Sequence, residues 1–164
     1  MKRATAAIAV VFAFAVFAPR VGERDRSEAT AIGAIRAIVS GEAGYASINE
    51  GYFGTLDCLA APSCVRGTLG GSNAFLDPEL AAAKERRGYR FEFHAGPKAE
   101  RESEQRRSRS AMTRFAVVAI PVNAGAPQHR AFCADDRGTI YFTQDGTVPR
   151  VDAGRCLDTA NPLR

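Results

Sequence analysis

Small apolar residues recur every three or four positions in the stretch "EATAIGAIRAIVSGEAGY" at 28–45. This spacing places them on one face of a helix. We expect the helix to begin near Ser27 as the N-cap, with Glu28 in the first turn, where the helix dipole favours a carboxylate. Its glycines lower the intrinsic helix propensity, so packing must hold the helix in place. The predicted buried stripe consists of Ala29, Ile32, Ile35, Val39, Ala43 and Ala46.

A second, shorter helix is predicted within "NAFLDPELAAAKERRGY" at 73–89. Asp77 is a suitable N-cap, Pro78 fits the first helical position, and Gly88 is a suitable C-terminal stop. These signals indicate a helix of about two to three turns. Between the two helices, residues 49–71 are rich in Gly, Pro and Cys, which favours irregular structure.

The hydrophobic period changes to two in the second half of the chain. "YRFEFH" at 89–94 alternates, and "RFAVVAIPV" at 114–122 is a β-branched run. "HRAFCADDRGTIYFTQDG" at 129–146 predicts two strands joined by a turn at 135–138. The expected fold is α+β, with the long N-terminal helix packed on an antiparallel sheet of about four strands. A long charged loop should separate the first two strands.

The N-terminus has the proportions of a secretory signal peptide. Lys2 and Arg3 precede the apolar stretch "ATAAIAVVFAFAVFA" at 4–18. That stretch is shorter than the roughly 20 apolar residues of a membrane span. We therefore expect 1–18 to be a signal peptide cleaved after Ala15 or Ala18, or else a short membrane anchor. The expected division continues with a charged linker at 19–27 and the α+β domain at 28–164.

Export would take the protein to the periplasm or the extracellular space, with anchoring to the inner membrane as the alternative. Membrane contact would then occur only through residues 4–18, if these are not removed. An oxidising compartment would also allow the cysteines to form disulfides.

The four cysteines allow three disulfide pairings, and the sequence does not select one. Local pairing of Cys58 with Cys64 and of Cys133 with Cys156 closes the smallest loops, and for that reason we prefer it. There is no C-x-x-C, and the two histidines are distant from the first pair of cysteines. We therefore do not expect the cysteines to bind a metal.

The charge of the chain is modest, formally +4, but much of the basic charge falls within residues 84–114, interleaved with Glu. Such a run is compatible with anionic lipid, nucleic acid or an acidic partner, although mixed charge is typical of a solvated loop. "EQRRSRS" at 104–110 adds basic charge, but the nearby aromatic residues have strand spacing and are expected to face the core. We therefore do not expect nucleic-acid binding.

No G-x-S-x-G or other nucleophile motif and no phosphate-binding glycine loop occurs, so no catalytic or cofactor residues are assigned.

Taken in order, several segments resemble bacterial type IV pilin-like and type II secretion pseudopilin-like proteins. These segments are "EATAIGAIRAIVSGEAGYASINEGYFGTLDCL", "GYRFEF", "FAVVAIPV" and "FCADDRGTIYFTQDG". The resemblance covers 28–148. The Phe-Thr-Leu-x-Glu block of prepilins is missing, and the apolar stretch that such proteins continue is interrupted from Pro19 to Arg24.

This resemblance implies an exported, non-catalytic structural or interaction module at the cell envelope, linked to type IV pilus or type II secretion assemblies and contacting protein partners. The alternative is a soluble periplasmic binding domain, or an enzymatic one, that shares only the architecture.

The resemblance also suggests calcium, which related pseudopilin heads carry near this hairpin. Carboxylate oxygens suit Ca²⁺, but the spacing here fits no EF-hand loop, and Asp-Gly is ordinary turn chemistry. We therefore predict no metal site and keep one weak calcium candidate: Asp135, Asp136, Asp145 and Asp152.

Overall fold

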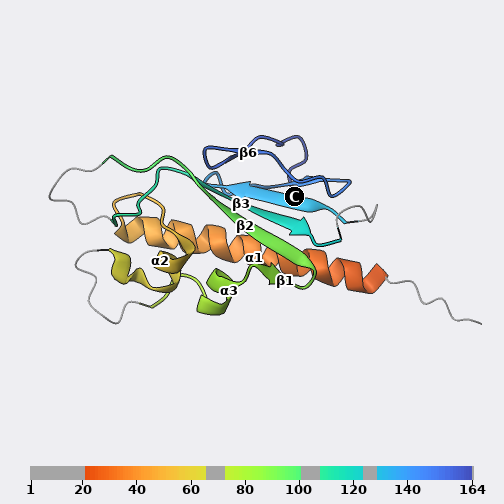
Figure 1. Ribbon diagram of the computed structural model, residues 1–164, viewed down its shortest axis with the longest axis horizontal. Coiled ribbons are helices and arrows are strands. Elements are labelled where there is room, and N and C mark those ends of the chain that lie inside the picture. The colour runs from red at the N-terminus through yellow and green to blue at the C-terminus, as the bar shows by residue number, and fades with distance from the viewer. Residues whose placement is uncertain (1–20, 66–72, 101–107, 124–128, 164) are drawn as a thin grey trace, which may run out of the picture.

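The computed structural model describes residues 21–65, 73–100, 108–123 and 129–163. A long helix, α1 (Val21–Ile48), runs along one face of a five-stranded antiparallel sheet. A small hairpin of β6 (Val151–Asp152) and β7 (Arg155–Cys156) lies on the other face (Figure 1). The predicted α+β class and the antiparallel sheet are confirmed. Among the described residues, no helix combines the length and apolar character needed to cross a membrane, and the predicted signal segment 1–18 lies outside them.

The sheet is a meander whose strands neighbour one another in chain order. It comprises β1 (Glu85–Arg86), β2 (Tyr89–Ala95), β3 (Phe115–Pro121), β4 (Ala131–Asp135) and β5 (Ile140–Thr143). The last four are the predicted strands. Gly138, at φ +80°, donates its N–H to Asp135 O at 2.9 Å and closes the predicted turn between β4 and β5. The hydrophobic period therefore located this part of the fold correctly.

The central strand β3 is buried on both faces along its whole length. Val117 and Ala119 belong to the core that α1 covers, whereas Ala116, Val118 and Ile120 belong to a second core beneath the β6–β7 hairpin. This two-sided burial explains why β3 is a continuous apolar run rather than an alternating one.

The buried stripe of α1 differs from the predicted one. Ile35 is buried as expected, but Ala29 and Ala43 are exposed. The most buried positions follow a strict alternation of three and four residues, each at most 4% exposed: Glu28, Ala31, Ile35, Ile38, Glu42, Tyr45 and Asn49. Three of these seven side chains are polar. The apolar spacing in the sequence therefore predicted a stripe displaced by one residue from the observed one. The described helix also begins at Val21, so Ser27 is not its N-cap and the predicted linker at 19–27 is helical from Val21 onward.

Two of these polar residues tie the ends of the stripe to distant segments. The Glu28 carboxylate accepts hydrogen bonds from Arg130 Nη2 at 2.6 Å and from Arg130 N at 3.3 Å. Asn49, at the other end, donates to Tyr52 O at 2.8 Å and accepts from Ser108 N at 2.7 Å. Burial by itself raises the pKa of Glu28, but the hydrogen bonds from Arg130 outweigh it and hold the pKa below its ordinary value.

The connection between α1 and the sheet contains three short helices: α2 (Leu56–Ala60), η1 (Pro62–Cys64) and α3 (Pro78–Ala82). Thr55 caps α2 within the segment predicted to be irregular. Asp77 caps α3 as predicted, through hydrogen bonds from Glu79 N and Leu80 N. The predicted length of α3 is wrong, because β1 pairs with β2 and takes the following residues into the sheet. Gly88, at φ +79°, therefore lies in the β1–β2 turn.

Two disulfides are present, Cys58–Cys64 and Cys133–Cys156, and these are the local pairs preferred from loop length. The first joins α2 to η1, and the second joins β4 to β7. Each loop closure stabilises the fold by about 2–4 kcal/mol in the chain-entropy model.

Small residues of α1 allow the chain before α3 to approach closely. A Cβ on Gly41 would lie 2.8 Å from Phe75 O, and one on Gly44 would lie 2.8 Å from Phe75 Cδ1. By contrast, a Cβ on Gly33 would meet no atom within 4 Å. The glycines at 41 and 44 therefore accommodate the Phe75 segment rather than the sheet.

This difference leads to a paired prediction. Gly41→Ala should lower the free energy of unfolding by about 1–3 kcal/mol, because the added methyl meets a backbone carbonyl that cannot easily move. Gly33→Ala, on the exposed side of the same helix, should raise it by up to about 1 kcal/mol through helix propensity. Urea denaturation of both variants measures the difference. Equal stability of the two variants would contradict the packing of Phe75 on α1.

Candidate functional site

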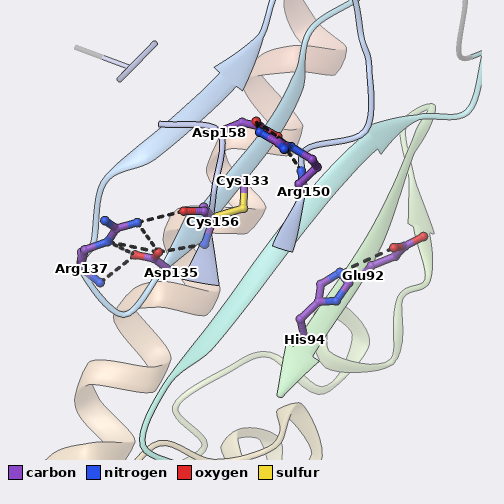
Figure 2. The surroundings of a disulfide bond; sticks show 8 residues. All are labelled: Glu92, His94, Cys133, Asp135, Arg137, Arg150, Cys156 and Asp158. Atoms are coloured by element: carbon purple, nitrogen blue, oxygen red, sulfur yellow. Dashed lines mark hydrogen bonds and ion pairs between the residues drawn. A yellow bond between two sulfur atoms is a disulfide. The ribbon is translucent and has the colours of Figure 1, made fainter. Parts of the chain in front are cut away.

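The disulfide on the outer face of the sheet, the face opposite α1, is surrounded by charged side chains held in fixed positions (Figure 2). Asp135 at the end of β4 is fully buried. Its carboxylate accepts hydrogen bonds from Arg137 Nη2 at 2.6 Å, from Arg137 Nε at 2.9 Å and from Cys156 N at 3.1 Å. Arg137 Nη2 also donates to Cys156 O at 3.2 Å. One carboxylate therefore joins the β4–β5 turn to β7, beside the Cys133–Cys156 bond.

The same contacts determine the ionisation of Asp135. Burial raises the pKa of a carboxyl group, but here the hydrogen bonds from Arg137 and Cys156 outweigh burial and hold the pKa below its ordinary value. Asp135 is therefore charged at neutral pH, and both of its oxygens are occupied by donors from the protein.

The other three residues of the weak calcium candidate have different surroundings. Asp136 pairs with Arg155 at 3.3 Å, and Asp145 accepts from Thr147 N at 3.0 Å within a turn. Asp152 is an exposed residue of β6. Within the described part of the chain, no group of three or more His, Cys, Asp or Glu residues is arranged to hold a metal ion. Asp135 and Asp136 thus pair with arginines, and Asp145 belongs to a turn.

A hollow of about 610 Å³ lies between β5 and the C-terminal segment, and we call it the C-terminal hollow. Its surface combines apolar and polar side chains from two stretches, 142–150 and 157–161. Val148 and Leu157 line it and are 47% and 49% exposed, respectively. The only other large apolar residue so exposed in the described part of the chain is Val122, which does not line the hollow.

An ion pair fixes the position of this surface. Arg150 Nη2 lies 2.8 Å from Asp158 Oδ1, and Arg150 N donates to Asp158 Oδ2 at 2.7 Å (Figure 2). The stretch between them contains β6 and β7, which the Cys133–Cys156 disulfide attaches to the sheet. Val148 and Leu157 therefore form a small exposed apolar patch beside this ion pair.

The other unusual group is a buried acid that the sequence did not single out. Glu42 is completely buried, and its Oε2 accepts a hydrogen bond from Gly54 N at 2.9 Å. Its Oε1, like the buried hydroxyl of Tyr45, has no hydrogen-bond partner among the described residues. Burial raises the pKa of Glu42 to about 8, although the Gly54 hydrogen bond opposes that rise. Because no solvent reaches Glu42, it is a neutral core acid at pH 7 and not a group that a substrate can touch.

Comparison with known proteins found no match: no protein-family model, no curated protein and no solved structure is similar to this chain. The function is therefore argued from the residues and their arrangement.

Glu42 predicts an unusual dependence of stability on pH. Between pH 4.5 and about 8 the folded protein keeps this proton while the unfolded chain has lost it. The free energy of unfolding should therefore fall with rising pH in that window, by about 1 kcal/mol per pH unit from this group. Glu42→Gln should remove this part of the slope, whereas Glu79→Gln at an exposed position should not. Urea titrations from pH 5 to 8 measure the free energy of unfolding of each variant. If this energy depended on pH in the same way in the wild type and in Glu42→Gln, Glu42 would not be neutral in the folded protein.

For Asp135 we predict the opposite dependence on pH: its contribution to the free energy of unfolding decreases as the pH falls into the acid range. Its stabilising contribution is present above its ordinary pKa of 3.8 and is lost as the pH falls below that value. At pH 7, Asp135→Asn should lower the free energy of unfolding by about 3 kcal/mol, because Arg137 loses its buried partner. Asp152→Asn, a change at an exposed position of the neighbouring β6–β7 hairpin, serves as the control. Chemical denaturation of both variants tests this, and equal stability would show that the carboxylate is not needed.

Proposed function

We propose that this chain is an exported, non-catalytic pilin-like module that contacts protein partners at the cell envelope. The order of its elements supports the proposal, since a long helix precedes an antiparallel meander and lies on one face of it. The segments that resemble pilin-like and pseudopilin-like proteins include α1 and the strands β2 to β5. Assemblies of the type IV pilus or type II secretion class are the proposed setting, entered through an export signal that lacks the prepilin block.

The cysteines support export. All four are paired, with no free cysteine among the described residues. Paired cysteines are typical of proteins that fold in an oxidising compartment such as the periplasm or the extracellular space.

One observation carries the proposed interaction role: Val148 and Leu157 are exposed in the C-terminal hollow, on a segment that a disulfide attaches to the sheet. The Arg150–Asp158 pair and the Cys133–Cys156 disulfide hold the backbone that presents these side chains. A surface fixed before binding loses little conformational entropy when it meets a partner. The helix and sheet would thus serve as a scaffold, and the C-terminal hollow would make the contact.

The second candidate function is a soluble periplasmic domain that binds a small molecule, or less plausibly transforms one. The volume of the C-terminal hollow favours it, because about 610 Å³ falls within the usual range of small-molecule sites. Its lining includes Thr143, Thr147 and Asn161, which supply neutral hydrogen-bonding groups beside the apolar residues.

A double variant separates these possibilities. Val148→Asp combined with Leu157→Asp should weaken capture of an envelope protein partner by at least about tenfold, because charge at the centre of an apolar contact must be desolvated. Val122→Asp, a comparably exposed apolar position outside the hollow, should leave capture unchanged. The measurement is cross-linking and co-purification of the tagged chain from envelope fractions of its own cells, with melting curves confirming that each variant folds.

The state of the mature N-terminus completes the test. A soluble product cut after Ala15 or Ala18 would indicate a free module, and retention of 4–18 in membranes would indicate an anchored subunit. A monodisperse protein without any partner in these fractions would refute the assembly role. A small molecule that raises the melting temperature of wild type but not of the double variant would favour the second candidate function.

A further inference from the structure

The two edges of the sheet are protected to different extents. At the β5 edge, Phe142 N donates to Asn161 O at 3.0 Å, and Leu163 N donates to Ile140 O at 2.7 Å. The C-terminal segment therefore covers that edge. At the other edge, β1 pairs only with the first two residues of β2, and Phe91 N donates to Lys84 O at 2.8 Å.

Beyond Phe91, the outward backbone groups of β2 have no partner among the described residues. Gly96 N donates to Arg114 O and Val122 N donates to Gly88 O, so the even-numbered residues of β2 form the hydrogen bonds to β3. The N–H and C=O groups of Phe93, and the N–H of Ala95, consequently point away from β3. No described strand or hydrogen bond reaches them on that side. An unpaired strand edge of this kind is a template for another strand.

A hollow of about 300 Å³, lined mostly by apolar residues together with Asp57 and Lys84, adjoins this open edge, and we call it the β2-edge hollow. Phe91 and Phe93 line it from β2, together with Leu56 of α2 and Leu80 of α3. Both phenylalanines are only partly buried. Because side chains alternate along a strand, a strand added beside β2 would direct every second side chain toward the same hollow.

Basic side chains dominate the end of this edge. Lys84, Arg86, Arg87 and Arg90 are all exposed, and the same stretch contributes only two carboxylates, Glu85 and Glu92. Glu92 is already paired with Arg90 at 3.0 Å. The remaining positive charge at the β1–β2 corner is complementary to an acidic segment.

We propose that the open edge of β2 binds an extended, acidic segment of a protein partner by adding it to the sheet as a further strand. Apolar residues at alternate positions of that segment occupy the β2-edge hollow, and its Asp or Glu residues face the basic β1–β2 corner. The β2-edge hollow shares no lining residue with the C-terminal hollow. This proposal can therefore be tested independently of the function proposed above.

The test uses the full chain and three blocked, fluorescent peptides. The first alternates Glu and Val, the second has the same composition with the residues in two blocks, and the third alternates Lys and Val. Fluorescence anisotropy should show that the alternating acidic peptide binds at least about tenfold more tightly than either of the others. Hydrogen exchange should slow at the amides of Phe93 and Ala95 when that peptide is bound.

Two variants show where the peptide binds. Ala95→Pro removes an outward N–H that the fold does not use, and Lys84→Glu combined with Arg86→Glu reverses the charge of the corner. Each should lower the affinity for the alternating acidic peptide by about tenfold, while Arg109→Glu at an exposed position elsewhere should leave that affinity unchanged. Melting curves identify any variant that fails to fold. If a variant fails, slowed hydrogen exchange at Phe93 and Ala95 of the wild type still shows where the peptide binds.

Three results would overturn the proposal. Equal affinity for the alternating and block peptides would show that charge alone attracts them. Binding without protection of Phe93 and Ala95 would place the peptide on another surface. A concentration-dependent dimer that excludes the peptide, detected by sedimentation, would show that the occupant of the edge is a second copy of this chain.

Discussion

The buried stripe of α1, which packs the helix on the sheet, is the feature on which the other contacts depend. Apolar side chains such as Ile35 and Ile38 supply the area that drives the helix onto the sheet, but such contacts permit sliding. Glu28 and Asn49 prevent sliding, because each hydrogen-bonds to a particular distant backbone group. An offset of one turn would leave a buried charge and a buried amide without partners, which costs several kcal/mol. The position of the helix is thus set by its polar residues.

The opposite face of the sheet is organised around one carboxylate and one disulfide. Asp135 and the Cys133–Cys156 bond attach the β6–β7 hairpin to β4, so β3 is covered on both sides. This second layer brings the C-terminal segment across the β5 edge. Within the described part of the chain, the two proposed contact surfaces, the C-terminal hollow and the uncovered part of β2, lie on either side of this covered region. The proposed interaction role rests on the first of them and the proposed strand addition on the second.

Local patterns predicted those elements whose physical cause is local. The alternation in β2, the Asp135–Gly138 turn and the Asp77 cap depend on neighbouring residues only, and the structure contains each of them. Prediction failed where a tertiary contact competed. The helix after Pro78 was expected to continue to Gly88, but pairing of β1 with β2 ends it at Ala82. Of the four aspartates that form the weak calcium candidate, Asp135 and Asp136 pair with arginines that the fold brings beside them, which the sequence pattern did not show.

By itself, the sequence determined the α+β class and the order of helix and strands, because hydrophobic period and turn chemistry act over a few residues. Loop length favoured the local disulfides without selecting them, and the structure contains that pairing. Only the tertiary structure decided which face of α1 is buried, since Glu28, Glu42 and Asn49 count as polar in the sequence and form hydrogen bonds with groups 12 to 102 residues away only in the fold. The same holds for the candidate surfaces. Which strand edge is covered depends on where the C-terminal segment returns, and no local pattern encodes that.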